Sequence, residues 1–279
     1  ASLEALGTER AAIDALNVFP VPDGDTGTNM FLTLESAADA LDEAAADPAA
    51  TLHSVGKALS TGALLGARGN SGVILSQILR AIAEELQSTA DGARFDGALV
   101  RRALRRASDL AYKAVAQPVE GTMLTVARAA AEAAEACDAN GISAVVEAGA
   151  KGARDALART TEMLPALRRA GVVDSGGAGL VVVYESMVDV LTGVRHARVP
   201  MRVTAPIAHD VQDAYGGPAF EVMYLLDATE GGVDELRPRL EALGDSLVIV
   251  GAEPLWSSKR SRPPACTSAG HCSTTMSSR

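Results

Sequence analysis

The sequence predicts a mainly α-helical protein, in which an antiparallel bundle of helices is followed by a small α/β domain. Apolar residues recur at helical spacing from the first residues to Thr192. Aromatic residues make up only 3% of the 279 residues and alanine is abundant, a composition that suits closely packed helices. After Thr192 the pattern becomes strand, helix and strand, which indicates a second domain.

The helical period and its breaks give the elements of the first domain, which we place over residues 1–197. The first helix carries Leu3, Leu6 and Ile13, and the turn Asp47-Pro48 ends the second helix. Since the chain starts at Ala1 with the first helical pattern already under way, we expect part of the N-terminus to be missing. Helices are expected at residues 3–16, 29–46, 51–65, 73–86, 96–115, 122–137, 142–160 and 180–192.

The second domain is expected over residues 198–256. Strands are predicted at 201–205, 219–226 and 246–251, and a helix at 233–243 despite Pro238. The remaining residues, 257–279, are rich in Ser, Thr, Pro and Arg and have no apolar period, which predicts disorder. We interpret this tail as an out-of-frame segment that leaves the second domain incomplete.

Composition excludes several classes of function. The net charge of −10 argues against nucleic acid and anionic membrane surfaces as partners, because phosphate binding needs a basic surface. The sequence shows no run of about 18 apolar residues and no signal peptide, so a cytoplasmic protein without an integral membrane segment is expected. The three cysteines do not make a disulfide framework. Cys137 reads as a small core residue, and a zinc site at Cys266, His271 and Cys272 has little support in such a tail.

The stretch from Asn17 to Asn29, Asn-Val-Phe-Pro-Val-Pro-Asp-Gly-Asp-Thr-Gly-Thr-Asn, has the strongest chemical signal. Its prolines favour an extended, stiff backbone that delivers Asp23 and Asp25 to the start of a helix. Two carboxylates this close repel each other unless a cation lies between them, and Mg²⁺ or Ca²⁺ prefers such oxygen ligands. An EF-hand is excluded by the missing ligand positions. The alternative is an ordinary acidic turn, since Asp-Gly pairs are common in turns.

Glycine-rich turns also open later helices. Gly-Ala-Arg-Gly-Asn-Ser-Gly occupies residues 66–72, and Gly-Val-Val-Asp-Ser-Gly-Gly-Ala-Gly occupies 171–179, with Asp174 or Ser175 as a candidate N-cap. The free N–H groups of such helix starts bind anions, although each turn alone could be an ordinary connection. Helix starts near residues 26, 71, 122 and 176 could gather at one rim of the bundle, which would suit a metal-bound polyphosphate.

Taken together, these motifs and Glu-Gly-Thr-Met at 120–123 make the chain resemble the nucleotide-binding domain of dihydroxyacetone kinases over about residues 10–195. Within that group it is most similar to the large, ATP-binding subunit of bacterial fatty acid kinase. The resemblance implies an antiparallel barrel of about eight helices with ATP and Mg²⁺ at one rim. It further implies phosphorylation of a fatty acid, presented by a separate fatty-acid-binding carrier protein, to an acyl phosphate. A homodimer is compatible with it.

The resemblance also assigns roles to residues. Asp23 and Asp25 would hold Mg²⁺ at the reacting phosphates, and Asn17 stands nearest to a third Asp of the dihydroxyacetone kinases. Thr26, Thr28 and Asn29 would lie near the nucleotide. Its phosphates, pocket and sugar or base would be contacted by Asn70, Ser71, Gly72, Thr122, Met123, Asp174 and Gly177. Two alternatives remain: a kinase of a small ketose such as dihydroxyacetone, and a truncated nucleotide-binding module without activity.

Overall fold

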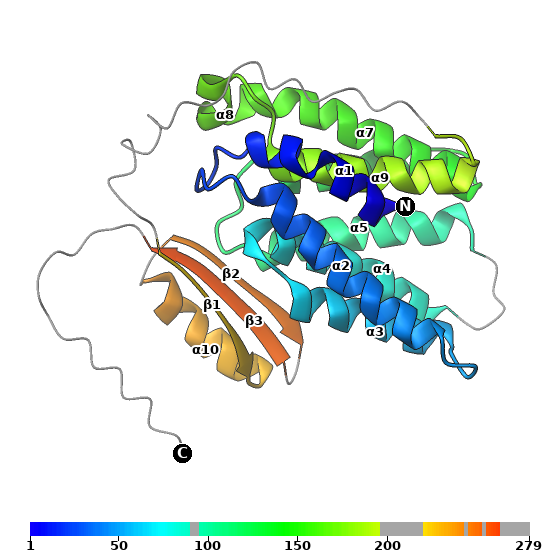
Figure 1. The fold of residues 1–279 in the computed structure, drawn as a ribbon, viewed down its shortest axis with the longest axis horizontal. Coiled ribbons are helices and arrows are strands. Elements are labelled where there is room, and N and C mark those ends of the chain that lie inside the picture. The colour runs from blue at the N-terminus through cyan, green and yellow to red at the C-terminus, as the bar shows by residue number, and fades with distance from the viewer. Residues whose placement is uncertain (90–94, 196–219, 243–244, 253–254, 263–279) are drawn as a thin grey trace, which may run out of the picture.

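A computed structural model of the protein describes residues 1–89, 95–195, 220–242, 245–252 and 255–262. The fold is mainly α-helical, as expected (Figure 1). The helices before residue 193 are α1 (Ser2–Ala15), α2 (Thr26–Ala45), α3 (Leu52–Gly66), α4 (Gly69–Ser88), α5 (Gly97–Ala114), α6 (Met123–Glu135), α7 (Ile142–Met163), α8 (Pro165–Ala170) and α9 (Ser175–Thr192). Each of the eight predicted helices is present, and the short α8 was not predicted.

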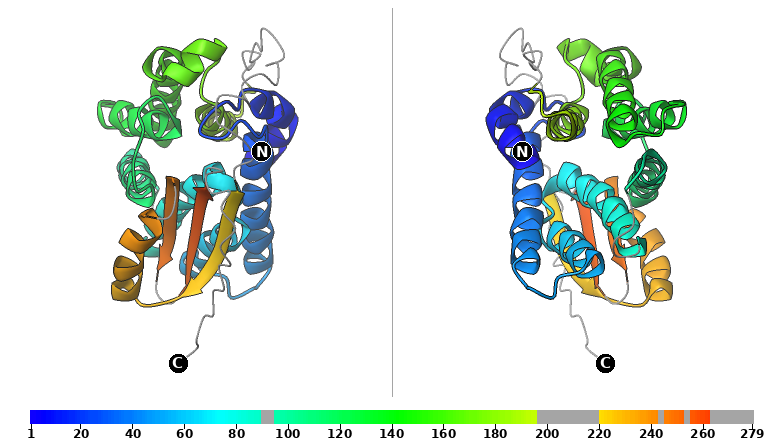
Figure 2. Two further views of the ribbon diagram at one scale, coloured as in Figure 1. Left: turned by 90° about the vertical axis from the view of Figure 1, so that its left-hand side faces the viewer. Right: turned by 90° about the vertical axis from the view of Figure 1, so that its right-hand side faces the viewer.

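The eight long helices close into a ring. Each of α1 to α6 packs against the next helix in the chain, α7 packs against α9, and α9 returns to α1. Figure 2 shows this arrangement from two opposite sides. Because consecutive helices alternate in direction, the starts of α2, α4, α6 and α9 meet at one end of the ring.

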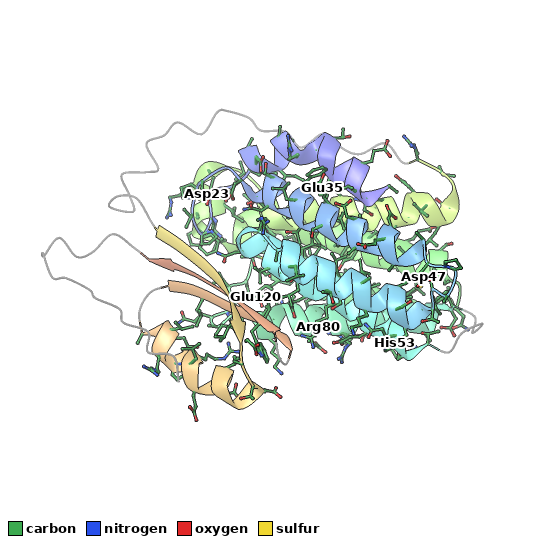
Figure 3. All side chains as sticks on the ribbon, turned by 60° about the horizontal axis from the view of Figure 1, so that its bottom comes forward. Asp23, Glu35, Asp47, His53, Arg80 and Glu120 are labelled. Carbon is green, nitrogen blue, oxygen red and sulfur yellow. The ribbon has the colours of Figure 1, made fainter. Side chains whose placement is uncertain are left out.

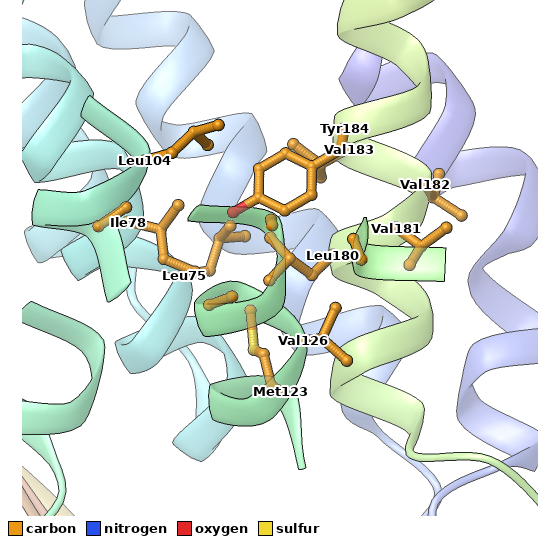
Figure 4. Close-up of a cluster of buried hydrophobic side chains, with 14 of the residues drawn as sticks. Leu75, Ile78, Leu104, Met123, Val126, Leu180, Val181, Val182, Val183 and Tyr184 are labelled. Atoms are coloured by element: carbon orange, nitrogen blue, oxygen red, sulfur yellow. The ribbon is translucent and has the colours of Figure 1, made fainter. Parts of the chain in front are cut away.

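Small residues let the helices approach closely. On α6, Ala127, Ala130 and Ala134 are fully buried. A Cβ atom at Gly152 of α7 would lie 2.4 Å from the Cβ of Ala133, so only glycine fits at that crossing. Larger side chains fill the centre, where the ring of Tyr184 lies near Leu75 and Leu180 (Figure 4). None of the described helices is both long and apolar enough to cross a membrane.

The second unit contains β1 (Phe220–Asp227), α10 (Glu230–Glu241), β2 (Asp245–Ala252) and β3 (Leu255–Arg262). The strands form an antiparallel sheet in the order β1-β3-β2, with Leu226 opposite Trp256 and Val250 opposite Ser257. Two of the predicted strands and the predicted helix, which contains Pro238, are confirmed. The strand expected at 201–205 lies outside the described residues, and the boundary at 197/198 stays a prediction.

The prediction that disorder begins at residue 257 is wrong, because β3 extends from Leu255 to Arg262. It is the central strand and pairs on both sides. Pairing uses backbone N–H and C=O groups, so a Ser/Lys/Arg stretch without an apolar period can still form a strand. Trp256 anchors its start, since the indole N–H donates to the carbonyl of Ala228 at 3.0 Å. Residues 263–279, with Cys266, His271 and Cys272, lie outside the described part.

Candidate functional site: a cavity where four helices begin

A cavity of about 360 Å³ opens at the end of the ring where α2, α4, α6 and α9 start. The helix starts that were predicted to gather at one rim therefore do so. Asp23 lies at this end, on the side of the sheet, whereas Asp47 and His53 lie at the far end of the helices (Figure 3). Ten of the thirteen residues proposed from the sequence line the cavity: Asn17, Asp23, Asp25, Thr26, Asn29, Asn70, Ser71, Thr122, Met123 and Asp174.

The acidic loop forms one side of the cavity. Asn17 is only 7% exposed, and its side-chain N–H donates to Oδ1 of Asp23 at 2.6 Å. That bond fixes the direction of the Asp23 carboxylate. Asp25 stands at the N-cap position of α2 but makes no capping hydrogen bond with its side chain, so its carboxylate is not used to cap the helix. The loop contains a cis peptide bond between Phe19 and Pro20.

Thr26 connects three of the helix starts. Its hydroxyl oxygen accepts a hydrogen bond from the Ser175 hydroxyl at 3.1 Å, and its carbonyl accepts one from the Ser71 hydroxyl at 3.5 Å. Thr26 begins α2, while Ser71 and Ser175 lie in the first turns of α4 and α9. The first N–H groups of a helix have no acceptor within that helix. This network therefore holds several backbone donors and hydroxyl groups around one space.

The start of α4 is built on Gly69, whose φ is +59°. A Cβ atom there would lie 2.2 Å from the side-chain nitrogen of Asn29, so the left-handed backbone and the close contact both require glycine. Thr33 ties the same helix start to α2, since its hydroxyl accepts from the Arg68 N–H at 3.1 Å and donates to the Asn29 carbonyl at 2.7 Å.

Asn70 has an unusual environment next to this turn. Its Oδ1 atom is buried, and no hydrogen-bond donor among the described residues reaches it. Burying an acceptor without a donor costs free energy, so such atoms are rare in folded proteins. Because Asn70 lines the cavity, a ligand in the cavity could supply the missing donor.

Asp174 lines the cavity and is 5% exposed. Its carboxylate accepts from the Gly177 N–H at 2.7 Å and from the Met123 N–H, so it caps α9 and α6 together. Its own N–H donates to the Thr160 hydroxyl at 3.0 Å. Burial raises the pKa of Asp174 to about 6, and these two amide hydrogen bonds act in the opposite direction. The prediction that Asp174 is an N-cap is confirmed.

A polar cluster supports the turn before α6. Arg128 donates two hydrogen bonds to Glu120, at 2.7 and 2.8 Å, and the hydroxyls of Tyr112 and Thr125 also donate to that carboxylate. Burial and the Glu120 hydrogen bond raise the pKa of Tyr112 to about 12. Next to Glu120, the Gly121 N–H donates to Thr125 at 2.9 Å. The cluster fixes the turn that presents Thr122 and Met123.

Three proposed site residues do not reach the cavity. The Thr28 N–H and hydroxyl donate to the Asp14 carboxylate at 3.0 and 2.8 Å, so its side chain faces α1. The Gly72 N–H donates to the carbonyl of Arg68, and the Gly177 N–H is used by Asp174. A Cβ at Gly72 would lie 2.3 Å from the Thr33 hydroxyl, so this glycine serves helix packing.

The charged side chains in the described lining of the cavity are all acidic. Its described lining includes the carboxylates of Asp23, Asp25, Asp174 and Glu241 but no Lys, Arg or His. The described residues also hold no group of three or more His, Cys, Asp or Glu side chains arranged for a metal ion. Beside bound phosphates, Mg²⁺ is usually held by one or two carboxylates together with oxygens of the phosphates themselves. The residues therefore fit a metal that arrives with a phosphate ligand.

Sequence reasoning missed some residues that line the cavity or cap the helices around it. Asp14 caps α2 from a different helix, and Ser175 was considered only as an N-cap. Leu247 and Glu241 belong to the second unit and still line the cavity. No local pattern marks these positions, because each acts through packing between distant segments. Phe19 also lines the cavity and lies inside the acidic motif, so the motif itself could have suggested it.

Comparisons with known proteins agree with this geometry. Residues 20–189 match the family model described as the DAK2 domain. The chain is 41% identical over 274 residues to protein YloV of Bacillus subtilis (strain 168), covering 91% of this chain and 48% of that protein. It is 37% identical over 257 residues to an uncharacterized protein of Staphylococcus aureus (strain bovine RF122 / ET3-1), covering 87% of this chain and 46% of that one. The chain thus spans about half the length of these relatives.

Proposed function

Because the chain belongs to the DAK2-domain family of kinase-related, nucleotide-binding proteins, we propose that it is the ATP-binding subunit of a phosphotransferase that converts a carrier-bound fatty acid to an acyl phosphate. The single observation that carries the proposal is the position of Asp23 and Asp25. They line the same cavity as the starts of α2, α4, α6 and α9. A nucleoside triphosphate bound in that cavity would be close both to backbone N–H donors and to carboxylates.

The chain's own residues have separable roles in this proposal. The N–H groups at the helix starts, including those of Ser71 and Thr26, and the Thr26 hydroxyl would bind phosphate oxygens. Asn17 orients Asp23, and Asp174 keeps the starts of α6 and α9 in place. Asp23 and Asp25 would hold Mg²⁺, which neutralises charge on the phosphates when bound. The buried Oδ1 atom of Asn70 lacks a donor among the described residues, so it could ligate a cation or accept from an N–H or O–H group of the nucleotide, but not pair with a phosphate oxygen.

The acceptor is proposed to be a carboxylate. A fatty acid is already ionised at neutral pH, so no general base has to remove a proton. An alcohol acceptor such as dihydroxyacetone needs one. No His or Lys lines the described cavity wall, and Asp23 and Asp25 are assigned to Mg²⁺ in this proposal. Asp174 is the most buried carboxylate of the wall, and its oxygens already accept amide N–H groups. A separate fatty-acid-binding carrier protein is part of the proposal, and so are a cytoplasmic location and a possible homodimer.

Calorimetry with MgATP tests the nucleotide site. Asp25→Asn is expected to weaken MgATP binding by about tenfold or more, because the substitution removes a charged metal ligand. Asp47→Asn is the matched control, since Asp47 lies at the far end of α2 and is expected to leave the affinity unchanged (Figure 3). Absence of MgATP binding by the unmodified chain would remove the proposal altogether.

The acceptor is tested separately. The chain is mixed with MgATP and a fatty-acid-loaded carrier, and the acyl phosphate is trapped with hydroxylamine. The expected result is a hydroxamate that forms only when both ATP and loaded carrier are present. If MgATP binds but phosphate is transferred to dihydroxyacetone instead, the nucleotide site stands and the proposed acceptor is wrong.

A further inference from the structure

The α/β unit contacts the ring of helices at the cavity, and β2 makes the contacts that lie nearest to the start of α4. Val250 of β2 is 3% exposed and packs in an apolar cluster with Ala67, Val73 and Ala114. Ala67 and Val73 flank the first turn of α4, which carries Asn70 and Ser71. A side chain of the second unit therefore packs directly behind a turn that lines the cavity.

A second contact lies where α5 gives way to α6. We call residues 115–119 the rim segment. Val115 forms a single β-bridge, and the N–H of Ala116 donates to the carbonyl of Leu247 at 3.2 Å. Val115, Ala116 and Val119 line the cavity, as does Leu247 itself. The edge of β2 is thus continued by a segment that forms the cavity wall.

A charged hydrogen bond fixes the same junction. The Arg80 guanidinium on α4 donates to the carbonyl of Gly251 at 2.6 Å and also pairs with Glu84 at 2.8 Å. Gly251 has a φ of +141°, a conformation that other residues rarely adopt, and it presents this carbonyl. Arg80 does not line the cavity. Its side chain acts on the position of β2 and not on any ligand.

From these contacts we propose that the α/β unit is a structural part of the nucleotide site, with Arg80 and Val250 as positioning residues for nucleotide binding. The inference rests on the proposed function, since it assumes that the cavity binds MgATP. β2 supports the α4 start through Val250 and the rim segment through Leu247. Loosening β2 therefore moves two walls of the cavity. By linkage, bound nucleotide must in turn stabilise β2 against opening.

Arg80→Gln tests the proposal in the full chain. We expect its MgATP affinity to fall about fivefold, because the substitution acts on the site through a coupled element and not by direct contact. Arg80→Lys keeps a cationic donor and is expected to recover part of the affinity. Arg154→Gln is the matched control, since Arg154 pairs with Glu185 at 2.8 Å away from the cavity and should leave the affinity unchanged. Val250→Ala is the second variant, and we expect it to lower the affinity for MgATP, as Arg80→Gln does.

Hydrogen exchange on the unmodified chain gives a readout that needs no substitution. MgATP is expected to slow exchange in residues 115–117 and 245–252 as well as at the helix starts. Equal MgATP affinities for Arg80→Gln and Arg154→Gln, with unchanged exchange in β2, would overturn the inference while the nucleotide site remains. Failure of the unmodified chain to bind MgATP would overturn the proposed function and this inference together.

Discussion

The buried carboxyl group of Asp174 makes a quantitative prediction about stability and pH. Burial raises its pKa from the ordinary 3.8 to about 6, so the folded state holds the proton more tightly than the unfolded state. Between these two values the folded protein binds more protons, and its free energy of unfolding must fall as the pH rises. The stabilisation is fully present below the unfolded pKa and is lost as pH rises through the folded pKa.

The size of this change in the free energy of unfolding depends on how much of the interval between pH 3.8 and about pH 6 is crossed. Each pH unit inside it corresponds to about 1.4 kcal/mol. On going from pH 7 to pH 5, only the interval below the folded pKa of about 6, about one pH unit, contributes. Protonation of Asp174 should therefore add about 1.4 kcal/mol to the free energy of unfolding. In Asp174→Asn this contribution is absent. The difference between the two proteins should therefore grow by that amount on going from pH 7 to pH 5.

Urea denaturation at pH 5, 6 and 7 measures the difference. Glu135→Gln is a useful control, because the Arg105 hydrogen bond lowers the pKa of Glu135 against a smaller raising effect of burial. Stability from such a group is lost only as pH falls through its folded pKa, below the ordinary 4.5. The free energy of unfolding of Glu135→Gln should therefore differ from that of the unmodified protein by the same amount at pH 5, 6 and 7. If the free energy of unfolding of Asp174→Asn also differs from that of the unmodified protein by a constant amount over this pH range, the reasoning is refuted.

Two further predictions concern groups that do not line the cavity. Asp14→Ala removes both hydrogen bonds to Thr28 at the start of α2 and should lower the free energy of unfolding by about 1 kcal/mol in thermal or urea melts. An unchanged melt would mean that α2 needs no cap from α1. Tyr184→Phe deletes a buried hydroxyl that has no partner among the described residues, so it should raise the free energy of unfolding by about 1 kcal/mol. A destabilised variant would show that the hydroxyl is paired in solution.

The helical period predicted every long helix but placed several starts too late. The helices expected at residues 29, 73 and 180 begin at Thr26, Gly69 and Ser175. The glycine clusters were interpreted as turns, whereas they form the first turns of α4 and α9. Their small size is needed because these turns pack closely against neighbouring helices. A Cβ at Gly179, for example, would lie 2.5 Å from the sulfur of Met30. Local propensity contains no information about such contacts between helices.

The limits of prediction for the site have the same origin. The motif around Asp23 and Asp25 is local, so residue type and spacing could suggest a ligand site there, with an acidic turn as the alternative; the structure places both residues at the cavity. Thr28 belongs to the same motif but faces Asp14, a residue of the preceding helix. The wall contributed by Leu247 depends on how the second unit packs on the first. The strand β3 was missed because its pairing is carried by the backbone and leaves no apolar pattern.

The charge distribution explains how a cavity lined by carboxylates could serve a polyphosphate. No cationic side chain lines its described wall, so direct repulsion would oppose an anion. Two features counter this. Four helix starts direct their positive dipole ends into the space, and a divalent cation held by Asp23 and Asp25, as proposed above, would cancel the charge of these two carboxylates. Backbone amides would then position the phosphates, while a divalent cation held by the carboxylates would offset part of their charge. Such a site does not need the lysine that other phosphate-binding loops use, provided that nothing displaces the four helix starts.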